Sequence, residues 1–164
     1  MSYPLVNGQN EVMALIEAEV SHGGVKVLLQ RHPEKSGRFL NWVVTVGMVR
    51  YGLPEIIVFG MEPEVVTTVI KYMMSVAVNG EIPAHLGTLP EDYFSLTVFS
   101  DFVSGPLVEQ YAVVIYDYYQ LKGMGAPKIT QWVVSDYEGR FPWNESFDPE
   151  LRDYQIMLLD GHAS

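Results

Sequence analysis

The sequence predicts an α+β protein: a largely antiparallel sheet of about five strands, with about three helices packed mainly on one face. Three segments place apolar residues at the i, i+3, i+4 spacing of an amphipathic helix. Between them lie short runs that are rich in β-branched residues and favour strands. The connection over residues 48–54 is too short for a helical crossover, so the runs on either side of it should pair antiparallel.

The expected helices have local start and stop signals. The first covers residues 10–22, with Asn10 as its N-cap and a double glycine after it. The second covers residues 62–78 and carries Pro63 in its first turn. The third covers residues 106–121. The second helix should bury one face in the core, formed by Val66, Val69, Ile70 and Met73.

The strands are expected between these helices. Their ranges are 25–30, 40–46, 55–59, 94–99 and 130–134. A short apolar run at 156–159 should precede a frayed end that begins near residue 160. No repeat or linker interrupts the chain, so we expect a single domain over residues 1–164.

Composition excludes several classes of protein. The chain has 164 residues and no cysteine, which rules out disulfides, thiolate metal sites and a cysteine nucleophile. No apolar run reaches the roughly 18 residues of a membrane-spanning helix, and the first residues lack the features of a signal peptide. We therefore expect a cytoplasmic protein with no membrane partner.

The formal net charge is −10, which argues against general nucleic-acid binding because phosphate contacts need clustered bases. The charge is uneven, since residues 81–117 hold six acids and no Lys or Arg. Five bases lie close together earlier in the chain: Lys26, Arg31, Lys35, Arg38 and Arg50. This basic stretch is either an ordinary solvated surface or a rim that attracts an anionic ligand or an acidic patch of a second subunit.

The block GRFPWNESFD, residues 139–148, is the most informative segment. Gly139 can adopt a positive φ and Pro142 fixes its own φ, so we expect an ordered loop. In one interpretation, Phe141 and Trp143 form an apolar platform beside Arg140, whose forked guanidinium binds a carboxylate or phosphate. In the other, Arg140 pairs with Asp136 and fastens the loop, and both aromatic side chains are buried.

Motifs for catalysis and cofactors are scarce. The four histidines are not spaced as metal ligands, so no metal site is expected. The sequence has no P-loop, no GxGxxG fingerprint and no GxSxG elbow, and its cofactor stays unknown. His32 lies in the basic stretch before a strand, and an enzyme would have to use His32, Asp136 and Arg140.

Two stretches resemble a known family. Residues 40–64, LNWVVTVGMVRYGLPEIIVFGMEPE, and residues 131–148 are similar to the two conserved blocks of DUF4262, a domain of unknown function found in bacteria and phages. The residues that match the family pattern are Thr45, Gly47, Pro54, Glu55, Asp136, Gly139, Arg140, Phe141, Pro142 and Trp143. Departures occur at Val44, Leu53, Ser135 and Asn144, where the family commonly has Tyr, His, Pro and an acid. The resemblance implies a fold and a site but no reaction.

The favoured hypothesis is a small cytosolic binding or interaction domain for an anionic small molecule or a protein. Its site would join the end of strand 40–46, with Thr45, Gly47 and Arg50, to the loop at 139–143. The alternatives are a hydrolase-type enzyme, and a bacterial or phage conflict protein that inhibits a host protein or sequesters a signalling nucleotide. Spare tyrosines and methionines in an acidic chain favour a homodimer.

Overall fold

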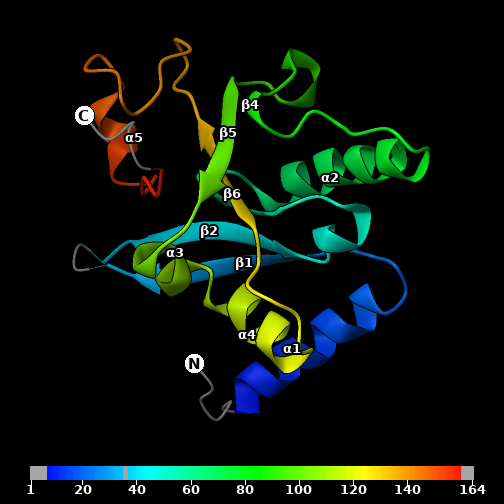
Figure 1. Cartoon of the computed structure of the whole chain (residues 1–164). Coiled ribbons are helices and arrows are strands. Elements are labelled where there is room, and N and C mark those ends of the chain that lie inside the picture. The colour runs from blue at the N-terminus through cyan, green and yellow to red at the C-terminus, as the bar shows by residue number, and fades with distance from the viewer. Residues whose placement is uncertain (1–6, 35–36, 160–164) are drawn as a thin grey trace.

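A six-stranded sheet forms the centre of the computed structural model, which describes residues 7–34 and 37–159 (Figure 1). The strands are β1 (Lys26–Pro33), β2 (Phe39–Val46), β3 (Glu55–Phe59), β4 (Gly87–Thr88), β5 (Val98–Val103) and β6 (Ile129–Val134). Their order across the sheet is β1-β2-β3-β6-β5-β4, and every neighbouring pair is antiparallel except β3 and β6. This confirms the α+β class, the largely antiparallel sheet and the antiparallel pairing of β2 with β3.

Helices cover both faces of the sheet, but unequally (Figure 1). They are α1 (Asn7–Val20), α2 (Pro63–Val78), α3 (Pro106–Tyr111), α4 (Val113–Leu121) and α5 (Pro149–Arg152), with the short 3₁₀ helices η1 (Met48–Tyr51) and η2 (Glu91–Tyr93). Side chains alternate along β2, so Trp42 and Val44 face α1, α3 and α4, while Val43 faces α2. Three α-helices therefore pack on one face, and α2 packs on the other together with residues of η1 and η2.

The buried face of α2 is the one that the sequence predicts. Val66, Val69, Ile70 and Met73 are at most 4% exposed and pack with the strand residues of that face. Pro63 begins the helix, because a residue in the first turn needs no N–H partner.

The expected helix at 106–121 is wrong in one respect, since the chain breaks it at Ala112 into α3 and α4. The indole Nε1 of Trp42 donates a hydrogen bond of 2.8 Å to the carbonyl oxygen of Tyr111. The next turn restarts from Ala112, whose carbonyl accepts from the N–H of Ile115 at 2.9 Å. A tertiary contact thus takes over a backbone acceptor that a continuous helix would use.

The strand expected at 94–99 is displaced to Val98–Val103, and the two-residue β4 extends the sheet to six strands. Val98 is the first residue of β5 to pair with β6, opposite Val134. Just before it, the N–H of Thr97 donates to the hydroxyl of Ser135 at 3.1 Å, and the N–H of Ser135 donates to the carbonyl of Thr97 at 2.9 Å. One of these two bonds goes to a side chain and not to the backbone, so the regular ladder of β5 and β6 ends at Val98.

Two buried glutamines attach the C-terminal segment to β6. The Gln155 side chain accepts from the N–H of Val134 at 2.7 Å and donates to its carbonyl at 3.0 Å. The Gln131 side chain donates to the carbonyl of Ile156 at 2.6 Å and accepts from the N–H of Leu158 at 2.8 Å.

The frayed end expected from residue 160 lies outside the described residues. Across residues 7–34 and 37–159, no helix combines the length and the apolar character needed to cross a membrane.

Candidate functional site

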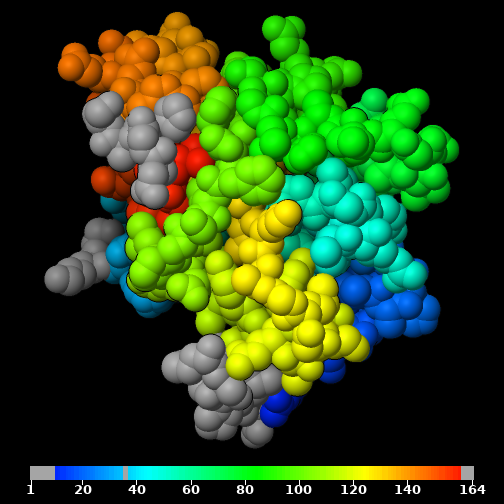
Figure 2. All heavy atoms as spheres, in the orientation of Figure 1, coloured from blue at the N-terminus to red at the C-terminus, as the bar shows by residue number. Residues whose placement is uncertain are grey.

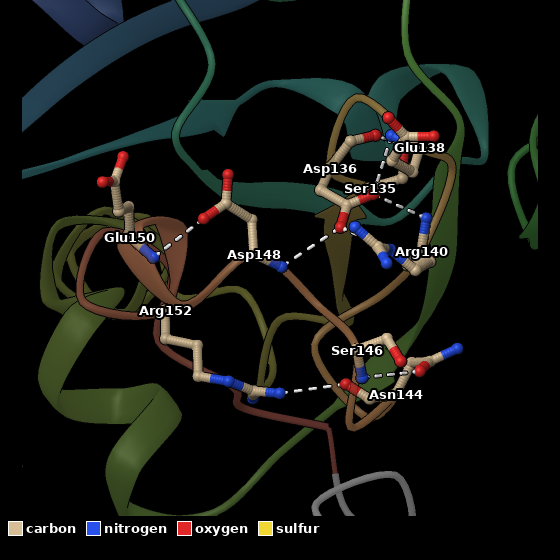
Figure 3. A network of polar contacts seen from close by, with 9 residues as sticks. All are labelled: Ser135, Asp136, Glu138, Arg140, Asn144, Ser146, Asp148, Glu150 and Arg152. Carbon is tan, nitrogen blue, oxygen red and sulfur yellow. Dashed lines mark hydrogen bonds and ion pairs between the residues drawn. The ribbon is translucent and has the colours of Figure 1, made fainter.

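The loop that follows β6 is organised by one buried carboxylate (Figure 3). Asp136 is 1% exposed and accepts four hydrogen bonds. Its Oδ1 accepts from the N–H groups of Glu138 at 2.9 Å and Arg140 at 2.8 Å. Its Oδ2 accepts from the Nε of Arg140 at 3.0 Å and the N–H of Asp148 at 3.1 Å. A single side chain therefore satisfies three backbone donors and one guanidinium.

These donors favour the ionised form of Asp136. Burial opposes ionisation, but the bonds from Arg140, Asp148 and Glu138 outweigh it, and the pKa of Asp136 lies below its ordinary value. Gly139 closes the turn with φ 78°, as the sequence predicts. The loop is thus held by charge-assisted hydrogen bonds.

The aromatic side chains of this loop pack against the protein. Phe141 and Trp143 are half-buried and stack on each other with ring centroids 4.8 Å apart. The ring of Phe99, on β5, meets both of them edge-on. Arg152 anchors the same loop by donating to the carbonyls of Pro142 at 2.7 Å and Asn144 at 2.9 Å. The two rings pack against the edge of the hydrophobic core and do not form an open platform.

A second buried carboxyl group lies at the start of β3. Glu55 is 0% exposed and accepts four hydrogen bonds. Oε1 accepts from the hydroxyl of Thr45 at 2.9 Å and the N–H of Met48 at 3.2 Å. Oε2 accepts from the N–H of Gly47 at 3.0 Å and the hydroxyl of Tyr119 at 2.6 Å. Burial raises the pKa of Glu55 even though these donors oppose the rise.

Local geometry explains why these residue types meet. Antiparallel pairing of β2 and β3 brings the last residues of β2 beside the first residue of β3. Gly47 has φ 121°, and a Cβ there would lie 2.9 Å from the carbonyl oxygen of Gly24. Only glycine fits this turn, which directs its N–H at Glu55.

Two cavities adjoin the ring of Tyr119. The larger, about 540 Å³, lies along α3, α4 and the segment after them, and we call it the α4 cleft. It is lined by Pro106, Glu109, Gln110, Val113, Tyr116, Asp117, Tyr119, Gln120, Met124, Gly125, Ala126 and Pro127. Figure 2 shows these elements, yellow-green to yellow, on the face turned to the viewer.

The smaller cavity, about 310 Å³, is called here the Arg50 pocket. It is lined by Glu17, Val20, Ser21, Gly47, Val49, Arg50, Tyr118, Tyr119, Lys122 and Met124. Tyr119 and Met124 therefore form a wall of both cavities. The hydroxyl of that same Tyr119 is the one that binds Glu55.

The residues predicted to form one site fall into two groups. Thr45, Gly47 and Arg50 lie near the N-terminal end of β3, where Glu55 is opposite Ile129 of β6. The loop with Asp136, Arg140, Phe141 and Trp143 follows the other end of β6. At about 3.3 Å per residue, β6 puts about 16 Å between its two ends. Because β6 runs parallel to β3, the structure brings these residues together in two separate groups and not in one.

His32 belongs to neither group. It lies on β1, at the edge of the sheet, opposite Leu40. It lines neither the α4 cleft nor the Arg50 pocket. Within residues 7–34 and 37–159, no three His, Asp or Glu side chains come together as a metal site.

Sequence reasoning did not include Glu55 and Tyr119 among the site residues. Tyr119 is 5% exposed, so its side chain is buried. Desolvation and the neighbouring Glu55 carboxyl raise the pKa of Tyr119 above its ordinary value. The available signal was Glu55 itself, a single acid at the head of the apolar strand EIIVF.

Comparison with known proteins adds a family. The family model described as "Domain of unknown function (DUF4262)" matches residues 21–148. That range includes the Glu55 cluster, α4 and the loop up to Asp148. Neither a curated protein nor a solved structure matches the chain.

Proposed function

The chain belongs to the DUF4262 family, a domain of unknown function, and on that premise we propose that it binds a small molecule in the α4 cleft. The observation that carries the proposal is the position of Tyr119. Its ring lines the cleft, and its hydroxyl is bound at 2.6 Å to the buried Glu55 carboxyl. Residues of the family motif thereby support the wall of a cavity.

The cleft has the size and lining of a ligand site. Its volume of about 540 Å³ falls within the range of known small-molecule pockets. Apolar side chains such as Val113 and Met124 provide contact area, and the tyrosines and glutamines provide polar groups that orient a ligand.

Preorganisation supports the same proposal. The Glu55 carboxyl that holds Tyr119 is itself held by Thr45, Gly47 and Met48. A wall fixed before binding costs less to order when a ligand arrives. This gives the motif residues of β2 and β3 a positioning role toward the cleft.

The loop at 139–148 supports binding less well. The Nε of Arg140 is committed to Asp136, and Phe141 and Trp143 pack against Phe99. Anion binding by Arg140, whose side chain is 37% exposed, stays a prediction. The hydrolase alternative has less support, because His32 lies on the edge strand and does not join Asp136 and Arg140.

The cellular setting stays part of the proposal. We place the domain in the cytosol, with an unidentified small molecule as partner and a homodimer as its assembly. The absence of cysteine from the sequence supports a reducing compartment. A conflict role remains compatible with a ligand-binding domain that sequesters its ligand.

A blocking substitution tests the proposal. A Cβ at Gly125 would meet no atom within 4 Å, so Gly125→Phe fills the cleft without a clash at that atom. Val78→Phe is the matched control, because Val78 is 72% exposed at the end of α2, on the opposite face of the sheet. Ligand-observed NMR with a mixed fragment library should give hits on the wild-type protein and on Val78→Phe that disappear with Gly125→Phe. Hits that survive in Gly125→Phe, or no hits on any variant, would refute binding in the cleft.

A further inference from the structure

We infer that the α4 cleft selects small organic cations, specifically a protonated amine on an apolar or aromatic body. The inference rests on the proposed binding function and adds the chemical class of the ligand. This ligand is opposite in charge to the anion that the basic stretch and Arg140 suggested.

The sign of the lining charge is the first reason. Glu109 and Asp117 are the charged residues of the lining, which holds no Lys, Arg or His. Lys122 lies between the lining residues Gln120 and Met124 in the sequence, and Lys128 follows the last lining residue, but neither belongs to the lining. An anion entering the cleft would meet a lining that carries carboxylates and no Lys, Arg or His, and like charges repel.

The aromatic wall is the second reason. Tyr116 and Tyr119 both line the cleft, and ring faces attract cations, most strongly where water is excluded. Burial raises the pKa of Tyr116, and the Glu109 charge raises it further. The field of Glu109 therefore reaches Tyr116, one of the two tyrosines that line the cleft.

The bases near this site are on the other side of the shared wall. Arg50 and Lys122 line the Arg50 pocket, which meets the cleft at Tyr119 and Met124. Lys122 is paired with Glu17 at 2.8 Å, and Nη1 of Arg50 donates to the carbonyl of Val20 at 3.0 Å. Both side chains are thus held on the Arg50 pocket side of the shared wall and do not line the cleft.

Three probes of one shape test the inference by ligand-observed NMR titration: phenethylammonium, phenethyl alcohol and phenylacetate. Phenethylammonium should bind most tightly and phenylacetate most weakly. Added salt should narrow the difference between their affinities. Glu109→Gln should weaken phenethylammonium about two- to fivefold, the loss expected for one partly exposed ion pair, and leave phenethyl alcohol unchanged. Glu91→Gln, an exposed acid in η2, should change neither affinity.

The outcomes separate the two proposals. If none of the probes binds, cation selection is overturned and the fragment experiment alone decides whether the cleft binds ligands. If the probes bind and Gly125→Phe fails to block them, they bind elsewhere and both proposals fall. If all three bind equally well, or phenylacetate binds best, and Gly125→Phe blocks them, the cleft stands and cation selection is overturned. An equal loss of all three probes in Glu109→Gln would likewise overturn it, because that pattern reports a change of shape and not of charge.

Discussion

Tyr119→Phe isolates the contact on which the proposed site depends. The substitution keeps the ring that lines both cavities and removes the hydroxyl that donates to Oε2 of Glu55 at 2.6 Å. Because Glu55 is 0% exposed, solvent has no access to replace the lost donor. The carboxyl group keeps its bonds from Thr45, Gly47 and Met48.

The expected cost follows from the kind of bond removed. A hydrogen bond to a charged group contributes about 1.5–3 kcal/mol, so where Glu55 is ionised we expect the free energy of unfolding to fall by about 2 kcal/mol. For a chain of this size, that corresponds to a fall in Tm of about 4–8 °C. Losing the donor also raises the pKa of Glu55 further, since the hydroxyl favours the ionised form.

The loss of stability in Tyr119→Phe should depend on pH in a definite direction. The pKa of Glu55 is raised in the folded state, so its favourable contribution is present below the unfolded pKa and is lost as pH rises through the folded pKa. The folded pKa is higher in Tyr119→Phe than in the wild type. The stability difference between the two proteins should therefore be smallest at low pH and grow as pH rises.

Urea unfolding followed by tryptophan fluorescence measures this effect, because Trp42 and Trp132 are buried and report loss of the core. The matched control is Tyr116→Phe, on the same helix and in the same cleft. The Tyr116 hydroxyl makes no hydrogen bond within the described residues, so its removal should change stability by less than about 0.5 kcal/mol. Equal midpoints for the two variants would refute the reasoning about Glu55.

Three further predictions concern the core and the loop after β6. Ile70→Ala should cost about 2–5 kcal/mol of unfolding free energy, as truncation of a buried aliphatic does, and hydrogen exchange showing α2 to be unprotected in the wild-type protein would contradict the fold. The lowered pKa of Asp136 means that its contribution is present above the unfolded value, near 3.8, and is lost as pH falls through the lower folded value. Asp136→Asn should therefore lower stability at neutral pH and flatten acid unfolding, whereas the exposed Asp153→Asn should leave the acid limb unchanged; the idea fails if both behave alike. Arg140→Ala should lower Tm and leave ligand binding in the folded fraction intact. Arg140→Lys should not restore Tm, because lysine lacks the guanidinium fork. Normal stability with lost affinity would instead show that Arg140 binds the ligand.

Several elements were predictable because their causes are local. The face of α2 follows from residues three and four apart, and Pro63 and Gly80 mark its ends. β3 follows from an uninterrupted apolar run, and the turn at Gly139 from the one residue type that adopts φ 78° without strain. These features depend on neighbours along the chain, which a single sequence contains.

The candidate site was less predictable because its contacts are distant in sequence. The Glu55–Tyr119 bond joins residues 64 positions apart, and the contact between Trp42 and Tyr111 that breaks the long helix spans 69 positions. No local pattern distinguishes Tyr119 from the other tyrosines of α4, since what buries it is the sheet packed beneath the helix.

By itself the sequence determined most of the helical and extended segments, the two blocks of family motif and the positions that require glycine, because each is decided by a few consecutive residues. Only the tertiary structure decided which of those blocks meet. Because β3 pairs parallel with β6, Arg140 lies near one end of these strands, and Thr45, Gly47 and Glu55 lie near the other. The physical reason is that strand order is chosen by the total burial of both faces, a property of the whole chain that neither motif encodes alone.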